Sequence, residues 1–147
     1  MWPMMFNYSV MDCDLKPQMP YHFIAKSQQT VALMAVRREL DSELELYIAN
    51  DTLETQNVKY TVTAYDKSGN TDIVDYGTIT QEKNSVSCVK ALGKQTEPKL
   101  LVIEWEQDGK IYFNHAFTSF ADYETMKEWL KIISKVFGLE REMLELK

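Results

Sequence analysis

The chain has 147 residues and a mass of 17.1 kDa, which is the size of one domain or slightly more. Its composition is 45% hydrophobic and 26% charged with few glycines and prolines, and this excludes a disordered chain or a collagen-like repeat. The net charge of −6 gives a surface that repels phosphate backbones, and no basic patch offsets it, so we expect no nucleic-acid partner.

The first 29 residues combine a short apolar run with a segment marked by Pro17 and Pro20. No apolar run in the chain approaches the roughly 20 residues of a membrane span, so we expect no membrane partner. Pro20 suits the first turn of a helix, where its missing N–H costs nothing. Tyr21, Ile24 and Ala25 follow at helical spacing, which predicts an extended piece leading into a short N-terminal helix.

From Thr30 onward apolar residues recur at every second position, which is typical of strands with one solvated face. Turn residues divide this region into seven expected strands, at 31–38, 43–48, 58–65, 73–80, 86–92, 99–106 and 110–114. The Asp108-Gly109 pair between the last two predicts a tight hairpin, because both turn positions need a positive φ. The pattern predicts a mainly β fold, an immunoglobulin-like antiparallel β-sandwich over residues 30–118.

The last part of the chain has the periodicity of an amphipathic helix. Its expected apolar stripe consists of Tyr123, Met126, Leu130, Ile133 and Phe137. Ser119 is expected to cap this C-terminal helix with Asp122 as its reciprocal partner, and Gly138 is placed to end it. Such a helix needs an apolar platform, which either the outer face of the sandwich or residues 1–29 would supply.

Few residues carry the chemistry of metal sites or covalent catalysis. Cys13 and Cys88 are far apart and neither belongs to a C-x-x-C pair, so we expect buried thiols rather than a disulfide or a zinc site. His22 and His115 lack the spacing of metal ligands, which favours structural roles. The sequence has no glycine-rich phosphate loop and no Gly-x-Ser-x-Gly turn, so neither a metal nor a cofactor is expected.

Carboxylates are numerous, but a glycosidase needs two of them facing one cleft. Glu104 and Glu106 flank Trp105 on one expected strand, which favours a solvated strand face over an acid–base pair. An enzyme that uses Glu104, Glu106 and His115 stays open as one alternative. Trp105 and Trp129 are interpreted as core or interface packing.

Three tyrosines on expected strands support a second alternative, a free-standing carbohydrate- or protein-binding sandwich. Tyr47, Tyr65 and Tyr76 would stack on sugar rings, although strand aromatics more often pack against neighbouring strands. The triplet Asn50-Asp51-Thr52 has the spacing of a glycosylation acceptor, a weak signal that also arises by chance.

Several short motifs occur in a suggestive order: Trp2-Pro3, then Lys16-Pro17, then Tyr21-His22-Phe23-Ile24-Ala25-Lys26. They resemble the last strand and helix of the catalytic barrel of family-2 glycoside hydrolases, β-mannosidase-like or β-galactosidase-like. The stretch Tyr47-Ile48-Ala49-Asn50-Asp51-Thr52 resembles a recurrent strand end in the immunoglobulin-like domain that follows this barrel. Glu104-Trp105, Asn114-His115 and Trp129-Leu130 resemble the closing strands and terminal segment of such enzymes.

The resemblance implies three parts: residues 1–29 as the end of a TIM barrel, 30–118 as the sandwich, and 119–147 as a C-terminal helix and tail. In the family the two catalytic glutamates lie on barrel strands before the Trp-Pro motif, so this chain is expected to carry no catalytic residue. Trp2 is the only position carried over as substrate-binding, and only within a full barrel, whose sites lie at the carboxyl ends of the strands.

The function implied by the resemblance is that of a non-catalytic C-terminal domain of a glycoside hydrolase acting on β-mannosides or β-galactosides. Its implied partner is the catalytic barrel of the parent chain, with carbohydrate and a homodimer contact left open. The resemblance alone suggests a periplasmic or secreted location, and it implies no cofactor.

Overall fold

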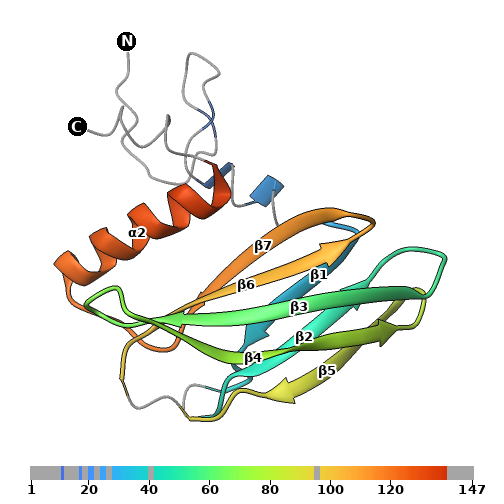
Figure 1. Ribbon diagram of the computed structural model, residues 1–147, viewed down its shortest axis with the longest axis horizontal. Coiled ribbons are helices and arrows are strands. Elements are labelled where there is room, and N and C mark those ends of the chain that lie inside the picture. The colour runs from blue at the N-terminus through green and yellow to red at the C-terminus, as the bar shows by residue number, and fades with distance from the viewer. Residues whose placement is uncertain are drawn as a thin grey trace.

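The architecture of the chain is mainly β, with one C-terminal helix. The computed structural model describes residues 11, 17, 20–21, 24–25, 28–39, 42–94 and 97–138. These residues form seven antiparallel strands in two sheets and the helix α2 (Figure 1), so the seven expected strands are confirmed. Of the expected helix after Pro20, residues 20–21 and 24–25 are described and are helical, and the rest of it lies outside the described residues.

The first sheet has three strands in the order β1-β2-β5. Their bounds are Val31–Val36 for β1, Glu45–Asn50 for β2 and Ser85–Ala91 for β5. Leu33 lies opposite the fully buried Ile48, whereas the neighbouring pair of Met34 and Tyr47 points to the other face. One face of this sheet is therefore core and the other is its outer face.

The second sheet has four strands in the order β4-β3-β6-β7. Their bounds are Gln56–Tyr65 for β3, Thr71–Gln81 for β4, Leu100–Gln107 for β6 and Lys110–Phe117 for β7. The turn between β6 and β7 has φ of 51° at Asp108 and 71° at Gly109, which confirms the expected hairpin.

The buried faces of both sheets contribute to one hydrophobic core. It draws on Leu46 and Ile48 from the first sheet and on Val58, Val62 and Trp105 from the second. The Trp105 side chain is 1% exposed, so its expected role in core packing is confirmed.

Helix α2, Tyr123–Phe137, begins at a different cap from the expected one. Asp122 is the N-cap, and its carboxylate accepts hydrogen bonds from the Thr125 backbone N–H and the Thr125 hydroxyl, both at 2.9 Å. The prediction of Ser119 as the cap was wrong, because residues 119–121 still carry the chain from β7 to the helix. Gly138 ends the helix with a φ of 69°, as expected.

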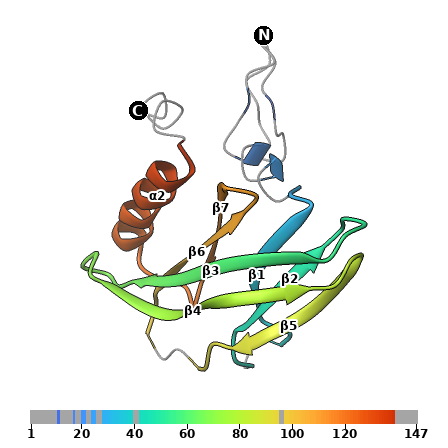
Figure 2. The same ribbon diagram turned by 45° about the vertical axis from the view of Figure 1, so that its right-hand side comes forward.

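The helix packs on the outer face of the four-stranded sheet, forming a second hydrophobic core (Figure 2). Trp129 and Ile133 of α2 meet Leu100 and Val102 of β6 in this core, and all four are buried. The Trp129 ring stacks on Phe117 with centroids 5.8 Å apart. The expected platform for the helix is thus the outer face of a sheet.

The stripe predicted for the helix was wrong at its first residue. Tyr123 is 77% exposed. Trp129, which is not part of the predicted stripe, is 1% exposed and is therefore core, as expected for this tryptophan. The Trp129 Nε1–H donates a hydrogen bond to the Asp66 carbonyl oxygen at 3.1 Å. This bond anchors the helix to the end of β3.

Asn50 ties the end of β2 to the β4–β5 connection. Its side chain is fully buried, and Nδ2 donates to the carbonyl oxygens of Glu54, Gln81 and Glu82 at 2.9, 3.2 and 3.1 Å. Its Oδ1 accepts from the Thr52 backbone N–H at 3.0 Å. The Asn50-Asp51-Thr52 triplet is therefore a structural turn, since the amide nitrogen that a glycan would need is enclosed in the folded chain.

Replacing Asn50 by alanine removes the shared donor of three carbonyl groups. We expect Asn50→Ala to lower the free energy of unfolding by about 2–3 kcal/mol, measured by urea denaturation. Asn57→Ala is the matched control: the Asn57 Oδ1 accepts only an exposed bond from Thr80, so the loss should stay below about 0.5 kcal/mol. Equal losses for the two variants would contradict this role of Asn50.

His115 of β7 lies under α2, with ring centroids 5.6 Å from both Phe117 and Phe137. Burial lowers the pKa of His115 from its ordinary 6.5. The unfolded chain therefore binds a proton more readily than the folded chain as the pH falls through 6.5. Stability should decrease as the pH falls from about 7.5 to about 5.5.

Urea denaturation across that pH range tests whether stability decreases as the pH falls. His115→Phe keeps an aromatic ring between the two phenylalanines and removes the titrating group, so part of the stability loss at acid pH should disappear. Both proteins contain the same carboxylates, so the difference between their stabilities at each pH reports the titration of His115 alone. Parallel pH profiles for the wild type and the variant would exclude His115 as the source.

Candidate functional site

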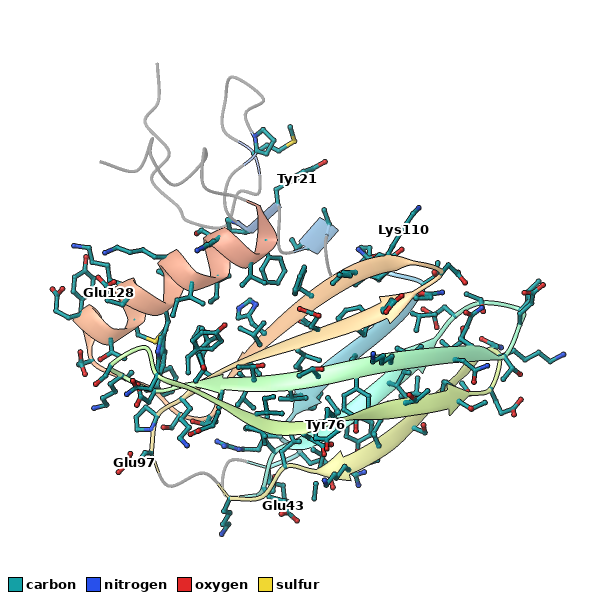
Figure 3. All side chains as sticks on the ribbon, in the orientation of Figure 1. Tyr21, Glu43, Tyr76, Glu97, Lys110 and Glu128 are labelled. Atoms are coloured by element: carbon teal, nitrogen blue, oxygen red, sulfur yellow. The ribbon has the colours of Figure 1, made fainter. Side chains whose placement is uncertain are left out.

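Helix α2 covers only part of the outer face of the four-stranded sheet. Beyond it, side chains from four strands form a surface that we call the open platform: Lys59, Thr61, Tyr76, Thr78, Glu104, Glu106 and Ile111. The strand register places Thr61 between Tyr76 and Glu104, and Lys59 between Thr78 and Glu106. Figure 3 places Tyr76 on β4, away from α2 and its Glu128.

Two shallow hollows flank β3 on this platform. The larger, about 440 Å³, lies on the β4 side and is lined by Tyr76, Thr78 and Ile73 together with Lys59 and Thr61. The smaller, about 170 Å³, lies on the β6 side and is lined by Glu104, Glu106 and Ile111 with the same lysine and threonine. Lys59 and Thr61 therefore form a ridge between the hollows.

The charged groups of the open platform are available to a ligand. Within the part of the chain that the structure describes, no ion pair or side-chain hydrogen bond engages Lys59, Glu104 or Glu106. All three side chains are exposed. The platform thus offers hydrogen-bond donors and acceptors beside an exposed aromatic ring.

Glu104, Glu106 and His115 do not converge on one point. The two carboxylates project from the same face of β6, roughly 7 Å apart along the strand, and point to solvent side by side. His115 is paired with Val102 and lies in the second core under α2. Opposed carboxyls across a cleft, which glycoside hydrolysis requires, are not formed by these residues.

The three tyrosines proposed as sugar contacts lie on separate surfaces. Tyr65 is partly buried and packs against the second core. Tyr47 lies on the outer face of the three-stranded sheet, where its hydroxyl donates to Glu45 at 2.7 Å and accepts from Arg38. Only Tyr76, 74% exposed, is presented on the open platform.

Cys88 is exposed on the edge strand β5, so the expectation of a buried thiol was wrong for this residue. Cys88 pairs with Tyr47 and, like it, points away from the core. The alternation of side chains along a strand predicts this orientation only once it is known which face of the sheet is core. Trp2, Cys13 and His22 lie outside the described residues. Among the residues that are described, no group of three or more His, Cys, Asp or Glu could hold a metal ion.

A polar network at the open edge between the two sheets was missed by the sequence analysis. The Tyr60 hydroxyl donates to Asp75 at 2.8 Å, and the Lys90 ammonium donates to the other Asp75 oxygen at 2.7 Å. Burial and the bond to Asp75 raise the pKa of Tyr60 to about 12. Burial acts to raise the pKa of Asp75, but the bonds from Lys90 and Tyr60 outweigh it and hold that pKa below its usual range.

This network joins β4 to β5, which belong to different sheets. Asp75 is paired with the fully buried Val62, so it is a charged residue at an inward position of a strand. A charge at such a position is the feature of the sequence that could have indicated the network. Inward-pointing charges are one means by which edge strands avoid pairing with other chains. We assign the network a structural role.

None of the helices in the described segments has the length and hydropathy of a membrane span. Comparison of the sequence with models of protein families gives no match, and comparison with curated proteins gives none either.

Proposed function

We propose that the chain is a non-catalytic, immunoglobulin-like β-sandwich from the C-terminal region of a family-2 glycoside hydrolase that cleaves β-mannosides or β-galactosides. In this proposal residues 1–29 belong to the end of the catalytic barrel and residues 30–118 form the sandwich. The domain packs against the barrel and does not itself cleave glycosides.

The strand order supports the sandwich. Strands β1, β2 and β5 share one sheet, and β3, β6 and β7 share the other, as the first, second, fifth and the third, sixth, seventh strands of immunoglobulin-like domains do. The fourth strand pairs with the third, which is the arrangement of the extra strand in variable-type domains. A single core supplied by both sheets agrees with this packing.

One observation carries the packing role: apart from Glu45 and its ion pair with Arg38, the outer face of the three-stranded sheet is apolar, and no described element covers it (Figure 2). We call this surface the bare face, and it consists of Met34, Val36, Tyr47, Ala49, Val86, Cys88 and Ala91. Val86 is 64% exposed and Val36 is 39% exposed. Contiguous apolar surface of this kind is typical of an interface with another protein or domain.

The position of β1 favours the barrel as the occupant of the bare face. Strand β1 belongs to the three-stranded sheet and follows residues 1–29, whose motifs resemble the end of the barrel. A barrel that precedes β1 is therefore held close to this sheet by the chain. High local concentration strengthens such a contact even when the interface is modest.

The second candidate is a free-standing carbohydrate- or protein-binding module, and the exposed Tyr76 favours it. A module that acts alone has no need of an apolar surface such as the bare face. We therefore rank the packing role first.

Association with a barrel tests the proposal. The 147-residue chain should bind a β-mannosidase-like barrel that lacks its own C-terminal domain, measured by analytical ultracentrifugation. Val86→Glu should weaken this complex at least about tenfold, because it places a charge in a desolvated apolar interface. Ile73→Glu is the matched control, since Ile73 is 65% exposed but lies on the other sheet, and it should leave binding unchanged.

Equal effects of the two substitutions would contradict packing through the bare face. A wild-type chain that dimerises by itself, and that Val86→Glu converts to a monomer, would contradict the barrel as the occupant and favour a second copy.

A direct assay tests the absence of catalysis. The isolated chain should hydrolyse aryl β-mannosides and aryl β-galactosides no faster than buffer does. Turnover above that level, lost in Glu104→Gln, would overturn the non-catalytic assignment.

A further inference from the structure

We propose that the open platform is a glycan-binding surface that takes a short, neutral oligosaccharide of hexose units across strands β4, β3 and β6. The choice of a glycan as the ligand class rests in part on the proposed function. The location of the site rests on the platform alone.

The exposed ring of Tyr76 supplies the apolar contact. A hexose presents a flat face of C–H groups and an edge of hydroxyl groups, so it suits an aromatic ring that has polar groups beside it. Tyr76 is 74% exposed and lines the larger hollow with Ile73 and Thr78. Its ring is therefore accessible from solvent, whereas Tyr65 is partly buried against the second core.

The polar groups lie in line with this ring. Thr61 is the direct neighbour of Tyr76 on β3, and Glu104 is the neighbour of Thr61 on β6. Adjacent strands are roughly 4.8 Å apart, so the line from Tyr76 to Glu104 spans about 10 Å, enough for more than one sugar ring. Glutamate oxygens accept hydrogen bonds and the threonine hydroxyl can donate one. The hydroxyl groups of a sugar can both donate and accept, so they can pair with both residues.

A second line of side chains runs parallel to the first. It consists of Thr78, Lys59 and Glu106 on the same three strands. Lys59 donates from the ridge between the two hollows, and Glu106 lines the smaller one. A sugar resting on the ridge would therefore meet donors and acceptors on both sides.

The shape of the platform limits how a ligand can lie. Phe113 follows Glu104 in the first line and packs against the second core, with its ring centroid 6.4 Å from that of Phe137. Helix α2 therefore covers the far end of the line, while β4 is the outermost strand at the other end of the described sheet. The platform stands on hydrogen-bonded strands, so little conformational entropy is lost when a ligand binds.

The charge of the platform disfavours other ligand classes. Two glutamates against one lysine give it a net charge of −1, which repels phosphate and other anions. The described residues show no metal-ligating cluster there. A basic peptide is the remaining competitor, and it is one outcome of the test.

The test is a titration of the full 147-residue chain followed by backbone amide NMR shifts. The probes are β-1,4-mannotetraose, β-1,4-galactotetraose and a tetralysine peptide. We expect at least one of the two sugars to shift the amides of β3, β4 and β6 near the platform, and the peptide to shift none.

Two tyrosine variants make the test specific. Tyr76→Ala should weaken sugar binding at least tenfold, whereas Tyr123→Ala, which removes an equally exposed tyrosine from α2, should leave it unchanged. Glu104→Gln should weaken binding severalfold, because the amide accepts hydrogen bonds less strongly than a carboxylate.

Three results would overturn the inference: no shift with either sugar, equal binding by the two tyrosine variants, or binding of the peptide alone. The proposed packing role is tested separately by barrel association, which Tyr76→Ala should leave intact. A chain that binds the barrel but no sugar refutes the glycan site only. A chain that binds sugar but no barrel refutes the packing role only.

Discussion

The four-stranded sheet must bury apolar side chains on both of its faces, and strand β6 sets where it does so. Over Leu100 to Ile103 every side chain is buried, because alternate residues enter the core between the sheets and the core beneath α2. From Glu104 onward only one face stays buried, and the carboxylates of Glu104 and Glu106 point to solvent. The same strand therefore defines both the seat of the helix and the start of the open platform.

Polar interactions connect parts of the fold that the two hydrophobic cores do not join. Asn50 satisfies three carbonyl groups where two turns meet, and its complete burial makes the bonds worth more than they would be in water. The Asp75 carboxylate joins Tyr60 and Lys90 at the edge where β4 and β5 separate into different sheets. Both sets of hydrogen bonds include one that joins residues that are far apart in the sequence and belong to different sheets. They therefore help to define how the two sheets align.

The two exposed faces differ in chemistry, and this difference underlies the functional proposals. The bare face is apolar except where the Tyr47 hydroxyl bonds to Glu45 and Arg38, so association with another protein or domain would lower the free energy by removing apolar surface from water. The open platform mixes an aromatic ring with charged groups that make no ion pairs among the described residues. A polar ligand with apolar patches suits the second surface, whereas a folded partner suits the first.

The sequence by itself determined the seven strands, the Asp108-Gly109 hairpin and the end of α2 at Gly138, because periodicity and positive φ are properties of neighbouring residues. It left the sites undecided: Tyr76 is exposed while Tyr65 is packed, Cys88 faces out, and His115 is separated from Glu104 by the packing of α2. Only the tertiary structure decided these, since strand order and the seat of the helix depend on contacts between residues far apart in the chain, and alternation alone names two faces without saying which is covered.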